Sequence, residues 1–141
     1  MSKHQATPEV LRAMLKKARQ KLAAARKDME FGFFGEASSR AYYAAFHAVS
    51  AVLAHHGLAF SSHAQTLAAF NREFVKTKVF PADTFRKLQR LFEDRQIADY
   101  DWTRDVDKQT AQKDLDDAQW LVDASCEYLE KTVGHSLRDN C

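Results

Sequence analysis

Near the start of the chain, apolar residues recur at alternating spacings of four and three positions. The series is Leu11, Leu15, Ala18, Leu22, Ala25 and Met29. This period places all of these side chains on one face of an α-helix. Thr7 is suited to the N-cap and Pro8 to the first helical position. We therefore expect an amphipathic helix over residues 8–29, whose apolar face must be covered by other parts of the chain.

Two further helices are expected after the turn "FGFFG". The first covers residues 36–56, because Gly57 stands where a C-terminal cap glycine belongs. Ser62 and Gln65 form a capping box that starts the second. The apolar face of this second helix consists of Leu67, Phe70 and Phe74.

The second half of the chain predicts two more helices. Pro81 is expected to open one of them, and its apolar side comprises Phe85, Leu88, Leu91 and Phe92. The polar and aromatic segment 98–107, "ADYDWTRDVD", is expected to form a loop. The last helix carries Leu115, Ala118, Val122, Cys126 and Leu129 on one face.

Turn-forming residues are scarce, with four glycines and two prolines. A β-sandwich or barrel needs many turns, so this scarcity favours long helices with few connections. The sequence predicts an all-α fold, an antiparallel four- or five-helix up-and-down bundle. We expect a single domain over residues 8–131, followed by a flexible tail over residues 132–141.

The composition narrows the possible functions. A net charge of +2 neither requires nor excludes a nucleic-acid partner. Cys126 and Cys141 lack metal-ligand spacing, which favours free thiols and a cytoplasmic protein. The sequence shows no carboxylate–histidine cluster and no glycine-rich phosphate loop, so no metal or cofactor is expected. No apolar run reaches the length of a membrane span, so no membrane association is expected.

The helix over residues 36–56 combines a core stripe with an alanine face. The core stripe comprises Tyr42, Phe46, Val49 and Leu53. The neighbouring arc comprises Ala41, Ala44, Ala45, Ala48 and Ala51. Small side chains allow another helix backbone to approach closely. The favoured interpretation is a tight contact inside the bundle, and the alternative is a dimer seam between two copies of this helix.

A third stripe on the same helix is polar and consists of Glu36, Arg40, Tyr43 and His47. Arg40 and His47 are separated by two turns, or about 10 Å of helix rise. One interpretation is an ion pair between Glu36 and Arg40, with Tyr43 and His47 half exposed. The other is a phosphate site on which the arginine and the histidine converge.

The helix that Pro81 opens carries charge on its apolar side. Arg95 and Asp99 both project onto that side. The outer side takes most of Arg86, Lys87, Arg90, Glu93 and Asp94. Because burying an unpaired charge is costly, we expect Arg95 and Asp99 to pair. The pair is either a structural one that fixes the end of the helix, or part of an internal cleft in which Arg95 binds a phosphate with Tyr100 beside it.

Three stretches together carry a family resemblance. They are "SSRAYYAAFHAVSAVL", "SSHAQTLAAFNREFV" and "LQRLFEDRQIADYD", in this order and spacing. The chain resembles the HEPN (higher eukaryotes and prokaryotes nucleotide-binding) family over roughly residues 10–130. The resemblance implies a four- or five-helix bundle that commonly dimerises and often works with a minimal nucleotidyltransferase. It also implies that ribonuclease activity is possible, since many members are ribonucleases and some are toxins.

The resemblance locates a ribonuclease motif, from which this chain departs. In ribonuclease members an arginine is followed, after four to six residues, by a histidine. Arg95 matches the arginine, but Tyr100 stands where the histidine is expected. Histidine titrates near neutrality and can accept the 2′-hydroxyl proton, whereas a tyrosine with a pKa near 10 is a poor base at pH 7. The substitution favours binding over catalysis.

We therefore expect a HEPN-like protein, forming a homodimer, that binds nucleotide or RNA and works with a nucleotidyltransferase in a toxin–antitoxin-like system. The candidate binding residues, expected to line one cleft or dimer groove, are Arg40, Tyr43, His47, Arg95, Asp99 and Tyr100. Two alternatives stay open. One is a metal-independent ribonuclease toxin, in which Arg95 or Arg40 acts with His47. The other is a non-catalytic dimeric interaction module.

Overall fold

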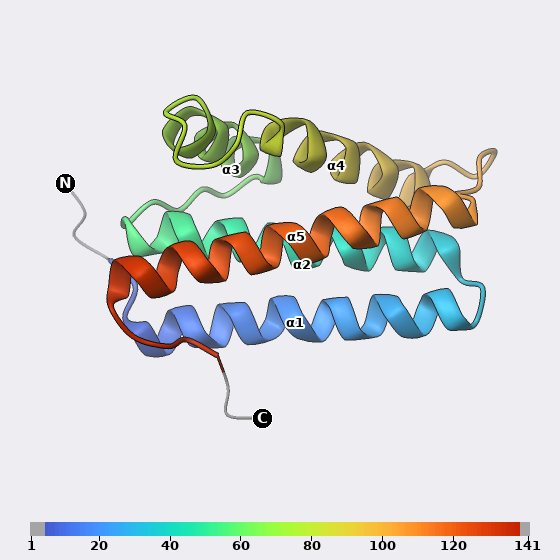
Figure 1. Cartoon of the computed structure of the whole chain (residues 1–141). Coiled ribbons are helices and arrows are strands. Elements are labelled where there is room, and N and C mark those ends of the chain that lie inside the picture. The colour runs from blue at the N-terminus through green and yellow to red at the C-terminus, as the bar shows by residue number, and fades with distance from the viewer. Residues whose placement is uncertain (1–4, 139–141) are drawn as a thin grey trace.

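The computed structural model describes residues 5–138 and shows helices joined by short connections (Figure 1). The elements are α1 (Pro8–Glu30), α2 (Phe34–His55), α3 (His63–Phe70), the π-helical turn η1 (Asn71–Val75), α4 (Thr84–Tyr100) and α5 (Lys108–Val133). Residues 5–138 contain no β-strand. The predicted all-α bundle is confirmed.

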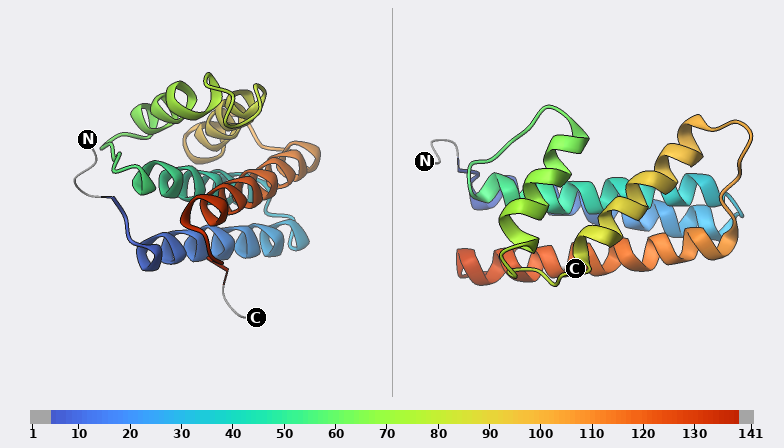
Figure 2. Two further views of the ribbon diagram at one scale, coloured as in Figure 1. Left: turned by 60° about the vertical axis from the view of Figure 1, so that its left-hand side comes forward. Right: turned by 90° about the horizontal axis from the view of Figure 1, so that it is seen from above.

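The long helices α1, α2 and α5 lie side by side, and α3 and α4 lie on the opposite side of α2 from α1 (Figure 1). α1 and α2 run in opposite directions, as do α4 and α5. Figure 2 shows α3 and α4 crossing the long helices obliquely, as the two arms of a V. α2 is the central element, because it packs against α1, α3, α4 and α5.

Local signals placed most helix ends correctly. The Thr7 hydroxyl accepts from the Val10 amide at 3.3 Å, and the Ser62 hydroxyl accepts from the Gln65 amide at 3.1 Å. Gly57 has a φ of 73°, a left-handed conformation that favours glycine. These observations confirm the predicted caps.

Two boundaries of α4 differ from expectation. Pro81 does not open the helix, because its carbonyl accepts from the Thr84 amide at 3.0 Å in a turn that precedes α4. The helix also continues through Tyr100 into the segment expected to be a loop. This extension matters for the site, since it keeps Asp99 one turn beyond Arg95 on the same helical face.

The alanine face of α2 is buried within the chain. Its members, Ala41, Ala44, Ala45, Ala48 and Ala51, are all fully buried. Small side chains here let α1 and α5 pack closely on α2, so the contact inside the bundle is confirmed. The alternative of a dimer seam along this face is wrong, because these side chains are already covered by the chain's own helices.

A buried ion cluster links α2, α4 and α5. Asp114 on α5 is 0% exposed and accepts from the Ser38 hydroxyl and from Arg90 Nη2, both at 2.9 Å. Arg90 Nη1 lies 2.8 Å from Asp117, and Arg90 Nε lies 3.7 Å from Asp94. The expectation that Arg90 and Asp94 lie on the outer side is therefore wrong. A helical wheel of α4 alone does not reveal that α5 supplies carboxylates beside it.

The segment after α5 folds back against the bundle. Leu137 is fully buried, its amide donates to Glu130 at 2.8 Å, and Arg12 on α1 donates to the Ser136 carbonyl at 3.1 Å. The domain limits and the flexible tail over residues 132–141 stay predictions, and residues 139–141 lie outside the described residues. Within residues 5–138, no helix is both long and apolar enough to cross a membrane.

Candidate functional site

The candidate site is centred on Arg95, which lies on the inner face of α4. The residue is only 9% exposed, and its Nε lies 3.1 Å from Asp99 Oδ2. The predicted Arg95–Asp99 pair is confirmed. Arg95 Nη2 also donates to the Tyr43 hydroxyl at 2.6 Å, and Nη1 donates to Gln96 at 3.3 Å. These contacts hold the guanidinium in one orientation between α4 and α2.

Three tyrosine rings surround the guanidinium of Arg95. Its central carbon lies 5.3 Å from the ring centroid of Tyr42, 5.2 Å from that of Tyr43 and 5.6 Å from that of Tyr100. Such distances allow cation–π attraction. Burial acts to lower the pKa of Arg95, but the hydrogen bond to Tyr43 and the nearby Asp99 carboxylate outweigh it and raise the pKa. The group therefore remains a fixed cation.

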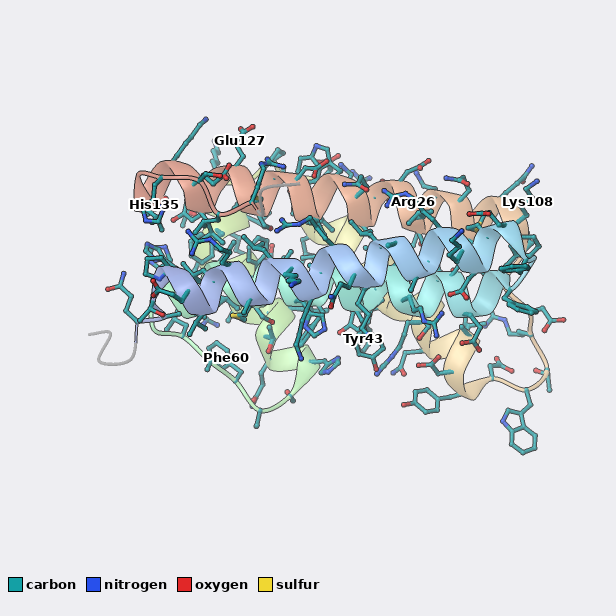
Figure 3. The ribbon with its side chains drawn as sticks, turned by 90° about the horizontal axis from the view of Figure 1, so that it is seen from below. Arg26, Tyr43, Phe60, Lys108, Glu127 and His135 are labelled. Atoms are coloured by element: carbon teal, nitrogen blue, oxygen red, sulfur yellow. The ribbon has the colours of Figure 1, made fainter. Side chains whose placement is uncertain are left out.

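Tyr43 on α2 contacts Arg95 on α4 and so connects the two helices that carry the candidate residues. Figure 3 places it on the side of α2 that carries α3 and α4. The other site tyrosine, Tyr100, is 66% exposed at the end of α4. Two residues later, Trp102 is 95% exposed and helps to line a surface hollow of about 520 Å³ together with Tyr100. Tyr100 and Trp102 are thus two large exposed rings at the end of the helix that carries Arg95.

His63, at the start of α3, is a member of the site that sequence analysis missed. Its ring stacks on Phe46, with centroids 4.0 Å apart and an interplanar angle of 18°. Its Nδ1 lies 2.7 Å from the Tyr42 hydroxyl, and its ring meets that of Tyr43 edge-on at 5.9 Å. Burial and the charge of Arg95 lower the pKa of His63. No local pattern indicates this role, because every partner of His63 lies on another helix.

Two of the other three members of the α2 polar stripe, Arg40 and His47, lie on either side of Tyr43 along the helix. Arg40 Nη1 contacts both carboxylate oxygens of Asp28 on α1 at 2.9 Å. The expected Glu36–Arg40 pair is wrong, since the partner of Arg40 is Asp28. The turn between α1 and α2 brings Asp28 beside Arg40, where the contact with Arg40 leaves Asp28 only 7% exposed.

His47 lies on the opposite side of Tyr43 from Arg40. Its pKa is lowered by burial, then by the charges of Lys21 and Lys17 on α1 and by His63. Within residues 5–138, no hydrogen bond or ion pair joins Arg40 or His47 to Arg95. Tyr43, Arg95, Asp99 and Tyr100 are therefore brought together, whereas a common groove that includes Arg40 and His47 stays a prediction.

Metal chemistry finds no support in the described part of the chain. No group of three or more histidine, cysteine, aspartate or glutamate side chains there could hold a metal ion. Cys126 is a free, buried thiol, and burial raises its pKa. Cys141 lies outside the described residues.

Comparison with known proteins decides the family. The model of the HEPN domain matches residues 11–129. The chain belongs to the HEPN family. A Thermotoga maritima relative named "UPF0332 protein" is 38% identical to this HEPN chain over 97 residues, which cover 69% of this chain and 70% of the relative. A Methanocaldococcus jannaschii protein named "Putative toxin MJ0142" is 29% identical over 130 residues, covering 92% and 84% of the two chains.

A solved structure supports the fold of this HEPN chain. The crystal structure of TT1696 from Thermus thermophilus superposes with a TM-score of 0.70 at 21% identity, covering 83% of this chain and 96% of that one. At this identity the likeness concerns the fold alone. It shows that the arrangement of α1 to α5 around α2 is shared with a protein of distant sequence.

Proposed function

We propose that this HEPN protein binds nucleotide or RNA through the phosphate groups, at a site centred on Arg95. The observation that carries the proposal is a fixed arginine cation, 9% exposed, held by Tyr43 and Asp99 beside the exposed ring of Tyr100. Arginine suits phosphate because its planar fork of donors matches two phosphate oxygens. A position that needs only packing would be filled at lower cost by an apolar residue.

The donors of Arg95 are only partly used. A guanidinium has five N–H groups. Within residues 5–138, Nη2 donates to Tyr43, Nη1 to Gln96, and Nε faces Asp99. One N–H group on each of Nη1 and Nη2 is left for oxygens of a ligand, and Nε is buried without a hydrogen-bond partner in that range. Tyr100 and Trp102 provide exposed rings at the same end of α4, and aromatic rings of this kind stack unpaired bases.

Binding has more support than RNA cleavage. At the position after Arg95 where ribonuclease members carry histidine, this chain has Tyr100, so the imidazole that would accept the 2′-hydroxyl proton is missing there. His47 has no described contact with Arg95. The likeness to a protein named "Putative toxin MJ0142" supports the proposal of a toxin–antitoxin-like role. A minimal nucleotidyltransferase is the partner proposed for this chain, since HEPN proteins often work with one.

Replacement of Arg95 by alanine is expected to weaken binding of a short single-stranded RNA about tenfold or more, since a hydrogen bond to a charged group contributes about 1.5–3 kcal/mol. The slope of log affinity against log salt should also become shallower by about one phosphate contact. Fluorescence anisotropy with a labelled oligonucleotide, over a salt series, measures both quantities.

The matched control is Arg86→Ala, which removes an exposed arginine from the same helix. Both variants should melt as cooperatively as the wild type by circular dichroism. Equal affinities for wild type and Arg95→Ala would contradict the proposal, as would wild-type protein that binds neither the oligonucleotide nor a nucleotide.

We also expect a homodimer, assembled at the end of the bundle that carries the α1–α2 turn and the α4–α5 loop (Figure 1). This end exposes Phe31 by 71% and Phe33 by 58%. A cluster of large, solvent-exposed apolar side chains is typical of a protein–protein interface. Sedimentation should give about twice the 16.1 kDa chain mass, and Phe31→Ser with Phe33→Ser should shift it toward the monomer. A monomer at all micromolar concentrations would contradict the expectation.

A further inference from the structure

We propose that His63 is a second phosphate-binding group of the Arg95 site, which donates a hydrogen bond from Nε2 while its imidazole is neutral. The inference rests on the proposed function, and it adds a residue from a third helix together with a defined protonation state. The ligand class is a phosphate oxygen of a nucleotide or RNA, contacted jointly by a guanidinium and an imidazole N–H.

His63 and Arg95 are held against the same two rings. The guanidinium carbon of Arg95 lies 5.3 Å from the Tyr42 centroid and 5.2 Å from the Tyr43 centroid. The His63 ring centroid lies 5.7 Å from that of Tyr42 and 5.9 Å from that of Tyr43. Stacking on Phe46 at 4.0 Å fixes the plane of the imidazole. A cation and an imidazole are thus positioned by one aromatic cluster.

Tyr42 determines which nitrogen of His63 carries the proton. Tyr42 is fully buried, and burial raises the pKa of its hydroxyl, so the phenol keeps its proton. A buried hydroxyl needs an acceptor, and the hydrogen-bond partner of Tyr42 Oη is His63 Nδ1 at 2.7 Å. Nδ1 is therefore the acceptor. In a neutral imidazole the remaining nitrogen, Nε2, then carries the hydrogen.

Nε2 of His63 is open to a ligand. The side chain is half buried, and Nε2 makes no hydrogen bond to any residue within 5–138. Several polar atoms within residues 5–138 are fully buried and have no hydrogen-bond partner, but His63 Nε2 is not one of them. Because Nε2 has no partner either, it must be accessible to solvent. The ring nitrogen of His63 that points away from Tyr42 is thus a free donor next to a fixed cation.

The charged and titratable groups around His63 favour its neutral form. Arg95 on α4 and His47 on α2 are the nearby positive or titratable groups. Tyr42 is a phenol whose pKa is raised by burial, and the Tyr43 hydroxyl accepts from Arg95. An imidazole with Nε2–H facing outward cannot accept a proton there. His63 is therefore suited to bind a phosphate oxygen, not to abstract the 2′-hydroxyl proton, which agrees with the loss of the family histidine at Tyr100.

Two variants of His63 distinguish a hydrogen-bond donor from a general base at this position. His63→Gln places an amide N–H₂ near the position of Nε2, whereas His63→Leu removes the donor. Both variants remove the imidazole nitrogen that accepts from Tyr42, and only glutamine keeps an acceptor, its amide oxygen. Circular dichroism checks that both variants remain folded. We expect His63→Leu to weaken binding of the labelled single-stranded RNA about tenfold and His63→Gln to stay within about threefold of wild type.

The matched control is His56→Leu. His56 also pairs with a tyrosine hydroxyl, Tyr128 at 2.8 Å, and packs on Phe74 at 5.2 Å. It lies 13 residues beyond Tyr43 along the chain, about 20 Å of helix rise from the site. Its replacement should leave RNA affinity unchanged. An equal loss in His56→Leu and His63→Leu would overturn the inference, because the effect would then come from general destabilisation.

Nitrogen NMR of the wild-type protein tests the protonation state directly. At pH 7.5 the ¹⁵N shifts of His63 should report a neutral ring with hydrogen on Nε2, and addition of RNA should shift the Nε2 signal. A hydrogen on Nδ1 would overturn the inference. RNA affinity equal in wild type and His63→Leu would overturn it while leaving the Arg95 proposal intact. Wild-type protein that binds no RNA or nucleotide would overturn both.

Discussion

Replacement of Arg90 by methionine is expected to lower the free energy of unfolding by about 3 kcal/mol, since it removes the hydrogen-bond donor of the buried Asp114 carboxyl group and the cation that pairs with Asp94 and Asp117. Arg90 is the cation shared by Asp114 at 2.9 Å, Asp117 at 2.8 Å and Asp94 at 3.7 Å. Asp114 is 0% exposed and cannot recover hydration after the change. Urea denaturation at pH 7.5, monitored by circular dichroism, measures the loss.

Arg86→Met is the matched control for this prediction. Arg86 lies one turn before Arg90 on α4 and is exposed, so its replacement should change the free energy of unfolding by no more than about 0.5 kcal/mol. If Arg90→Met and Arg86→Met were equally stable, the cluster would contribute nothing to the fold. Its role in joining α4 to α5 would then be wrong.

Replacement of Asp114 by asparagine is expected to remove a pH dependence of stability. Burial, and then the neighbouring Asp94, raise the pKa of Asp114 to about 8 in the folded protein. In the unfolded chain an aspartate has a pKa of about 3.9. Between these values the folded state holds a proton that the unfolded state has released. The stability contributed by Asp114 is thus complete below about pH 4 and is lost as the pH rises to about 8.

The slope of this effect is at most about 1.4 kcal/mol per pH unit for one proton. We expect the difference in free energy of unfolding, wild type minus Asp114→Asn, to fall by roughly this amount per unit between pH 5 and pH 7.5. Taking the difference cancels the opposing contribution of His47, His55 and His63, whose lowered pKa values make stability rise with pH. A difference that is constant over this range would show that Asp114 ionises normally.

The helices and the inner face of α2 followed from local sequence. Apolar period, cap residues and the scarcity of glycine and proline depend on neighbours within a few positions. They determined the ends of α1 and α2 to within about two residues, the start of α3 at the Ser62 cap, and the apolar face of α5. The start of α4 was placed at Pro81 instead of Thr84. A proline at the first helical position and a proline in the preceding turn look alike in sequence, because both need only its fixed φ.

The candidate site likewise contains one contact that could be predicted from the sequence and others that could not. The Arg95–Asp99 pair could be predicted because both residues lie one turn apart on a single helix. The contacts of Arg95 with Tyr43 and of His63 with Tyr42 could not, since each joins two helices whose relative position no local pattern specifies. A resemblance to a family identified Arg95 and Tyr100, but it could not indicate a histidine that reaches the site from α3.

What the sequence by itself determined is the set of helices, the faces they bury and the family, because each depends on spacing along one chain segment. Tertiary structure alone decided which charges on different helices meet. Arg40 pairs with Asp28 instead of Glu36, and Arg90 faces inward to Asp114. The physical reason is that a charged side chain is stabilised by whichever opposite charge lies within a few ångströms, and packing of α2 against α1 and of α4 against α5 sets those distances.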